Sequence, residues 1–130
     1  MAEAFVWSRE DLEKVYLVSR LVFRKDITPE KAAEKLAEII KNPPDANMVF
    51  FNMYIHMKTG RIFRQSGGDE VIVYFMKRIA EDDGEQALSL ALKSVYGYTG
   101  FKESVGCDMN NLNRVCSAIE KATGVKPFGV

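Results

Sequence analysis

The sequence has very few of the residues that usually build a metal site or a disulfide framework. Its 130 residues include two cysteines, Cys107 and Cys116, and a single histidine, His56. The separation of the two cysteines fits no common zinc-binding spacing, and two cysteines in a chain of this size do not form a disulfide scaffold. We therefore expect reduced thiols, no bound metal and no cofactor.

Recognisable catalytic motifs are missing as well. The sequence contains no phosphate-binding loop, no dinucleotide-binding glycine fingerprint and no nucleophilic serine elbow. His56 could act as a general base if Asn52, one helical turn earlier, oriented its ring. A structural role for His56 at the edge of the core explains the same residue without any chemistry. We expect that the protein is not an enzyme, and a small enzyme that uses His56 is the weaker alternative.

The chain also lacks a charge excess and a long apolar run. Its 18 basic and 18 acidic side chains give a formal net charge of zero, whereas nucleic-acid-binding domains usually carry a clear basic excess. This balance excludes a surface that is basic throughout but allows a local basic patch. No apolar run approaches the roughly 18 residues of a transmembrane helix, and the acidic N-terminus does not resemble a signal peptide. We expect a cytoplasmic protein that makes no membrane contact.

Strong helix signals organise most of the chain. Ser8 and Thr28 have the residue type and context of helix N-caps, and Pro29 fits the first position of the helix that follows Thr28. Apolar residues then recur at helical spacing in five or six stretches. We predict an all-α, compact single-domain bundle of about six helices over residues 1–130, with residues 1–7 and 125–130 as tails.

Glycines and acidic residues are expected to set the bounds of the second-last helix. Asp83 and Gln86 have capping-box spacing, so we predict that Asp83 caps this helix. Gly97 and Gly100 follow Tyr96 directly, and glycine weakens a helix interior. The helix is therefore expected to end near Tyr96.

Residues 45–59 allow two interpretations. Their alternating apolar residues would suit a strand, and a turn at Gly60 would then complete a hairpin over about 48–64 in an α+β fold. As a helix, the segment would begin with a cap at Asp45 or Asn47 and stop at Gly60. We favour the helix because strands of ten or more residues are uncommon, and the hairpin remains the alternative.

A basic segment follows this apolar stretch. Residues 41–80 hold six basic and three acidic side chains, and Lys58, Arg61 and Arg64 are grouped with Phe63. Basic side chains next to aromatic rings can hold phosphates and stack on bases. We therefore name Lys58, Arg61, Phe63 and Arg64 as candidate nucleic-acid-binding residues, although such a group is also common on an ordinary solvated loop.

A further set of residues resembles a known family in its order along the chain. The set covers about 100 residues and includes Thr28-Pro29-Glu30, Asn52, Met57, Gly60, Phe63, Arg64, Tyr74-Phe75, Asp83-Gly84, Leu88, Ala91, Leu92 and Val95. It resembles the helical domain at the N-terminal end of HNH-type and modified-cytosine-type restriction endonucleases. In that family an Asp-Tyr-Gly break stands where this chain has Asp82-Asp83-Gly84.

The resemblance implies a module without catalytic activity, because the nuclease residues of such proteins lie in a separate domain. It implies contact with duplex DNA, or assembly with a nuclease or another protein in a restriction or defence system. A protein–protein interaction module, such as a small phage or defence-related protein, is the alternative. The many methionines and aromatic residues favour this alternative, because adaptable apolar side chains suit partner surfaces.

Overall fold

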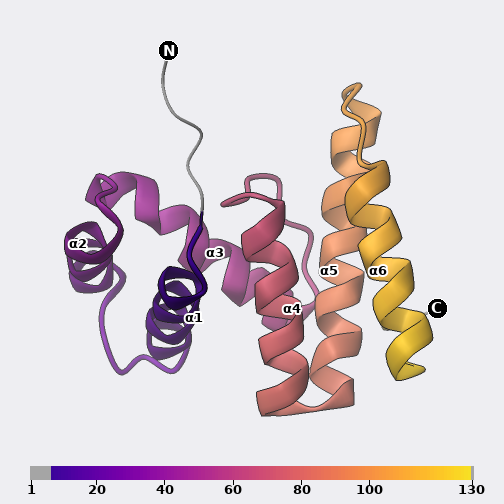
Figure 1. The fold of residues 1–130 in the computed structure, drawn as a ribbon, viewed down its shortest axis with the longest axis horizontal. Coiled ribbons are helices and arrows are strands. Elements are labelled where there is room, and N and C mark those ends of the chain that lie inside the picture. The colour runs from indigo at the N-terminus through magenta and orange to yellow at the C-terminus, as the bar shows by residue number, and fades with distance from the viewer. Residues whose placement is uncertain (1–6, 130) are drawn as a thin grey trace. The chain divides into compact units, whose positions relative to one another are not determined.

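The structure is a computed structural model that describes residues 7–129 (Figure 1). Within this range the regular structure consists of six α-helices without a strand: α1 (Arg9–Phe23), α2 (Pro29–Ile40), α3 (Pro44–Thr59), α4 (Asp69–Asp83), α5 (Glu85–Ser104) and α6 (Asn110–Thr123). The predicted all-α fold is confirmed. The alternative hairpin at about 48–64 is wrong, because α3 stays helical through Thr59. Of the predicted tail at residues 1–7, all but Trp7 lies outside the described residues.

Contacts between the helices divide the chain into two compact units, Met1–Phe51 and Asn52–Val130. The first unit holds α1, α2 and the first half of α3. The second unit holds the other half of α3 together with α4, α5 and α6. The single-domain organisation stays a prediction, and every candidate site lies within the second unit.

Local signals shape the first unit. The side chains of Ser8 and Thr28 accept hydrogen bonds from backbone N–H groups in the first turns of α1 and α2, at 3.0 and 3.3 Å, which confirms both predicted N-caps. Asn47 does not cap α3 as proposed, because the helix already begins at Pro44. Its side chain is buried instead, and Nδ2 donates to the carbonyl oxygen of Ala33 at 3.0 Å.

In the second unit α4, α5 and α6 lie side by side, with α5 in the middle (Figure 1). The second half of α3 contributes Met53, Tyr54 and Met57, which are all fully buried. The Tyr54 ring meets Phe75 of α4 edge to face, with centroids 5.7 Å apart. The apolar stretch that allowed two interpretations in the sequence is therefore mainly core.

Helix α3 is followed by a glycine in the left-handed backbone conformation. Gly60 has φ of 73°, and the N–H of Arg61 donates to the carbonyl oxygen of His56 at 3.0 Å, which is the wide hydrogen bond of a Schellman ending. The structure confirms the predicted stop at Gly60. A side chain at this position would also meet Leu90, because a Cβ placed on Gly60 would lie 3.0 Å from Leu90 Cδ2.

After Gly60 the chain runs along α5 for several residues, which we call the exit segment (residues 60–64). Ser94 Oγ donates to the carbonyl oxygen of Arg61 at 2.5 Å, one turn further Ile62 lies on Gly97, and Phe63 stacks on Tyr98 with centroids 4.7 Å apart. Four extended residues span about 13 Å, and a helix of the same length contains about nine residues. The exit segment and α5 can therefore run alongside each other, with about two residues of α5 beside each residue of the exit segment.

The helix α5 does not end near Tyr96 as predicted but continues through Gly97 and Gly100 to Ser104. The reason is packing. A Cβ placed on Gly97 would lie 2.5 Å from Cγ1 and 3.3 Å from Cβ of Ile62, so only glycine allows the exit segment this close to the helix. Gly97 marks a close approach of two segments and not a helix end.

Asp83 does not cap α5 either. It is the last residue of α4, and the turn to α5 is made by Gly84 with φ of 89° and no side-chain cap. Its carboxylate instead binds Lys58 of α3, with Nζ and Oδ2 2.5 Å apart. The capping-box spacing with Gln86 is therefore incidental.

Residues 125–129, expected to be an unstructured tail, pack against α5. Val125 is buried, Ser89 Oγ donates to the carbonyl oxygen of Lys126 at 2.7 Å, and the N–H of Phe128 donates to the carbonyl oxygen of Ser89 at 3.1 Å. Lys126 also pairs with Glu120 of α6 at 3.6 Å. The C-terminal segment thus fixes the Phe128 ring beside α5.

We predict that Gly97→Ala destabilises the protein by about 1–2 kcal/mol, because the clash with Ile62 outweighs the gain in helix propensity. Gly100→Ala is the matched control. Gly100 lies in the same helix and nothing stands within 4 Å of its added Cβ, so this change is expected to be neutral or stabilising by up to about 1 kcal/mol. Urea denaturation measures both, and adding Ile62→Ala to Gly97→Ala should restore stability. Equal effects of the two alanines would contradict the assigned contact.

Candidate nucleic-acid interface

Two of the four predicted binding residues are engaged inside the protein. Lys58 forms the ion pair with Asp83, and the two side chains are only 14% and 19% exposed. Phe63 is buried and stacks on Tyr98 at an interplanar angle of 15°. Lys58 therefore holds α3 to α4, and the Phe63 ring cannot stack on a base. Both side chains therefore have structural partners, and their contact with nucleic acid stays a prediction.

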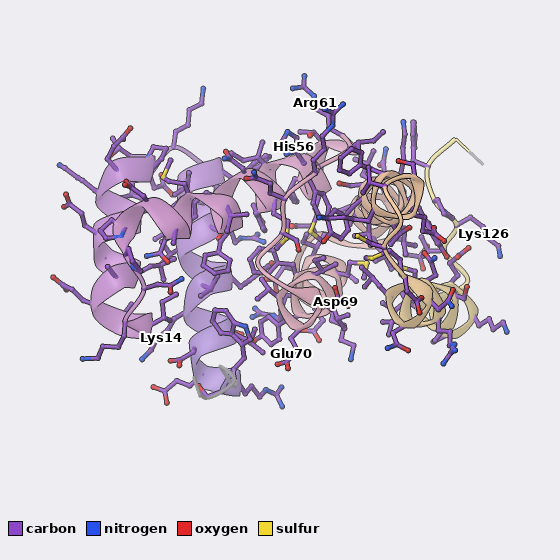
Figure 2. The ribbon with its side chains drawn as sticks, turned by 90° about the horizontal axis from the view of Figure 1, so that it is seen from above. Lys14, His56, Arg61, Asp69, Glu70 and Lys126 are labelled. Atoms are coloured by element: carbon purple, nitrogen blue, oxygen red, sulfur yellow. The ribbon has the colours of Figure 1, made fainter. Side chains whose placement is uncertain are left out.

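The other two predicted residues reach solvent. Arg61 and Arg64 are both exposed, and the Arg64 guanidinium lies 5.2 Å from the centroid of the Phe101 ring. A guanidinium over an aromatic face is held in place and still presents its N–H donors outward. Figure 2 shows Arg61 projecting outward near His56 at the end of α3. The exit segment therefore displays two arginines on its outer side.

Two lysines of α5 extend this surface. The stem of Lys93 lies along Gly60, with its Cδ 3.7 Å from a Cβ placed there, and its Nζ is 5.5 Å from the Phe128 ring. Nζ of Lys102 is 5.9 Å from the ring of Tyr98, on which Phe63 stacks. Sequence reasoning missed both lysines, because nothing in the sequence gives the register between the exit segment and α5.

We call Arg61, Arg64, Lys93 and Lys102 the basic strip. None of the four forms an ion pair with a carboxylate of residues 7–129. Two other lysines of the second unit are neutralised, since Lys58 pairs with Asp83 and Lys126 with Glu120. The basic strip is therefore a local positive surface in a chain of zero net charge.

Arg78 of α4 does not extend the strip. Arg78 pairs with Glu81 and Asp82 of its own helix, at 3.3 and 3.1 Å. The acidic side chains of Asp69 and Glu70 lie at the start of α4, away from Arg61 (Figure 2). Neither Arg78 nor these two carboxylates is therefore part of the basic strip.

His56 is half-buried, and its Nδ1 is shut off from solvent without a hydrogen-bond partner. Asn52 is exposed one turn earlier and does not orient this nitrogen. A general base needs an orienting group and access to a substrate proton. The geometry around Nδ1 provides neither, which favours the structural interpretation of His56.

A second polar cluster joins α5 to α6. The Tyr96 hydroxyl donates a short hydrogen bond to Glu120, whose other oxygen pairs with Lys126. Burial, and then the hydrogen bond to the Glu120 carboxylate, raises the pKa of Tyr96 to about 12. Burial and the charge of Glu120 also raise the pKa of the Cys116 thiol to about 12. These shifts keep both groups protonated, so neither is an activated nucleophile.

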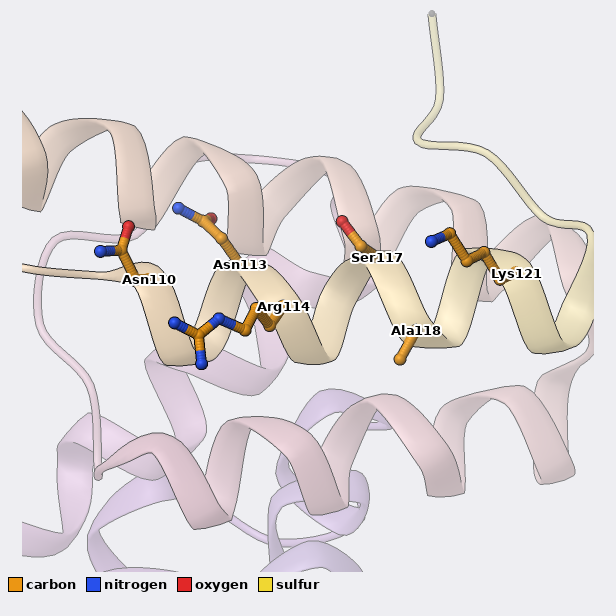
Figure 3. Close-up of a pocket in the computed structure, with 6 residues that line it drawn as sticks. All are labelled: Asn110, Asn113, Arg114, Ser117, Ala118 and Lys121. Carbon is orange, nitrogen blue, oxygen red and sulfur yellow. The ribbon is translucent and has the colours of Figure 1, made fainter.

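An open groove of about 520 Å³ runs along the outer face of α6 (Figure 3). Its lining side chains are Asn110, Asn113, Arg114, Ser117, Ala118 and Lys121. Asn113 donates to Glu103 at 3.5 Å, while its Oδ1 is buried without a partner. Because the lining comes from one helix, the groove is a surface hollow rather than an enclosed ligand site.

Two classes of site are not found in the described part of the chain. Residues 7–129 contain no group of three or more histidine, cysteine, aspartate or glutamate side chains placed to hold a metal ion. Over the same residues, no helix has both the length and the apolar character needed to cross a bilayer.

Comparisons with models of known protein families, with curated proteins and with solved structures give no match to this chain. The resemblance to the helical domain of restriction endonucleases therefore stays a prediction, and the basic strip has to be interpreted from its own chemistry.

We predict that Lys58 contributes to stability through Asp83. Lys58→Met removes this ion pair from the mostly buried carboxylate of Asp83, which should cost about 1–2 kcal/mol. The exposed Arg61→Met is the control and should change stability by less than about 0.5 kcal/mol. Urea denaturation of Lys58→Met, Asp83→Asn and the double variant gives the coupling energy. A coupling near zero would show that the ion pair adds nothing.

The two thiols should differ sharply in reactivity. Cys107 is exposed and Cys116 is fully buried with a raised pKa. At about pH 8 we expect one thiol per native chain to react with 5,5′-dithiobis(2-nitrobenzoate), and two after denaturation. Cys107→Ser should abolish the native reaction. Because its pKa is near 12, Cys116 should stay slow even at about pH 10; rapid reaction of both native thiols would contradict the structure.

Proposed function

We propose that the protein is a non-catalytic module that contacts nucleic acid through the basic strip. The observation that carries this proposal is a set of four exposed or half-exposed cations along the exit segment and on the two flanks of α5 beside it, none of which pairs with a carboxylate of residues 7–129. Phosphate contacts supply most of the affinity of non-specific nucleic-acid binding. They do not require a basic excess over the whole chain, only cations that are free and close together.

The way the cations are held supports the same proposal. Lys93, Lys102 and Arg64 each lie over an aromatic ring, which restricts the side chain while leaving its hydrogen-bond donors open. A cation that is already ordered loses less conformational entropy when it binds a phosphate. An ion pair, by contrast, would have to be broken first, as it would at Lys58.

A protein partner is the second candidate function. Ile62 and Val105 are 60% and 61% exposed, although both are large apolar side chains. Ile62 lies between the two arginines of the exit segment, so an acidic partner with an apolar anchor would also fit. The link to a restriction or defence system rests on the sequence resemblance alone.

The basic strip predicts salt-dependent binding. In fluorescence anisotropy at about 50 mM salt, we expect the full chain to bind labelled DNA, with affinity falling steeply as salt rises. Arg61→Ala/Arg64→Ala should weaken binding to every sequence tested. On duplex DNA the double variant should also lower the salt slope by about 1 for each phosphate that it no longer neutralises.

The charge-matched control is Lys31→Ala/Lys35→Ala, which removes two exposed lysines of α2 in the first unit. This variant should bind as the wild type does. No binding of either single-stranded or duplex DNA at low salt would refute the proposal, as would equally weakened binding by the two double variants.

A further inference from the structure

The basic strip is not made of charge alone. Ile62 stands between Arg61 and Arg64 and remains 60% exposed, even though one side of it covers Gly97. Its packing on the glycine holds one side of the side chain against α5, while the rest of its surface stays open to solvent. An apolar group held in the middle of a cationic surface indicates a ligand that offers apolar surface between its charges.

An exposed aromatic ring lies at one end of the strip. Phe128 is 50% exposed, and its backbone is anchored by the hydrogen bond to Ser89. Lys93 reaches from this ring to Gly60, so it connects Phe128 with the arginines of the exit segment. Phe128, and not the buried Phe63, is therefore the aromatic side chain of this surface on which a base could stack.

Single-stranded and duplex nucleic acids differ in what they offer to such a surface. A duplex presents phosphates outward and keeps the faces of its bases stacked inside. A single strand presents phosphates together with free base faces, and stacking on an aromatic side chain contributes about 1–3 kcal/mol per base. Only the single strand can use the cations and the apolar side chains at the same time.

We infer that the basic strip binds single-stranded nucleic acid in preference to duplex. Arg61, Arg64 and Lys93 hold the phosphates, a base stacks on Phe128, and Ile62 contacts the next base or sugar. This inference rests on the proposed nucleic-acid function and narrows its ligand. The strip covers about 13 Å of α5, which limits contact to a short run of nucleotides and predicts no sequence specificity.

The test compares a fluorescein-labelled oligothymidylate of about 15 nucleotides with a mixed-sequence duplex of the same length, at about 50 mM salt. We expect the single strand to bind at least tenfold more tightly. Phe128→Ala should weaken single-strand binding by about five- to one-hundredfold without changing its salt slope, because stacking releases no counterions. Phe128→Tyr should keep the affinity.

Val105→Ala is the matched control, because Val105 is equally exposed and apolar but lies past the end of α5, outside the basic strip. It should leave binding unchanged. Duplex binding as tight as single-strand binding, with Phe128→Ala without effect, would overturn this inference while the proposed function stands. Absence of binding to both probes would overturn both. Tighter binding of polyglutamate than of oligothymidylate would also overturn both and would favour the acidic protein partner.

Discussion

The contact between Ile62 and Gly97 is the constraint on which the second unit depends. With any side chain at position 97, a Cβ would stand 2.5 Å from Ile62, and the exit segment would have to move off α5. The stacking of Phe63 on Tyr98 and the bond from Ser94 to the backbone of Arg61 both need that close approach. The glycine costs helix propensity, and the packing that it permits offsets this cost.

Local chemistry made several helix bounds predictable from the sequence. A cap such as Ser8 or Thr28 acts on N–H groups within its own first turn, so it can be recognised from residues that are adjacent in the sequence. The stop at Gly60 is local in the same sense, since φ of 73° suits glycine. The errors at Gly97 and Asp83 have the opposite cause. Their partners, Ile62 and Lys58, are 35 and 25 residues away in the chain, and no local rule gives that register.

The same distinction explains how much of the candidate site was predicted. Arg61 and Arg64 were found because the basic segment is continuous in sequence. Lys93 joins them only through the packing of α5 against the exit segment. Lys58 and Phe63 fit the sequence pattern equally well. In the structure both side chains turn toward the interior, Lys58 one residue before the end of α3 and Phe63 three residues after Gly60. A cluster in the sequence indicates which residue types are available for a surface. Tertiary packing then determines which of these side chains remain exposed.

A positive surface can exist in a chain of zero net charge because some cations of the second unit pair with carboxylates and those of the basic strip do not. Asp83 and Glu120 are each engaged by a lysine, and the acidic residues at the end of α4 are engaged by Arg78. Each lysine pair removes one charge of each sign from what a ligand meets, and the single charge of Arg78 is offset by two carboxylates. Around the exit segment Arg64, Lys93 and Lys102 lie over aromatic rings instead, and a cation–π contact leaves the positive charge in place. The aromatic residues of α5 and the C-terminal segment therefore hold basic side chains in position, as carboxylates do elsewhere in the unit. Unlike carboxylates, they do not cancel the positive potential that a polyanion would meet.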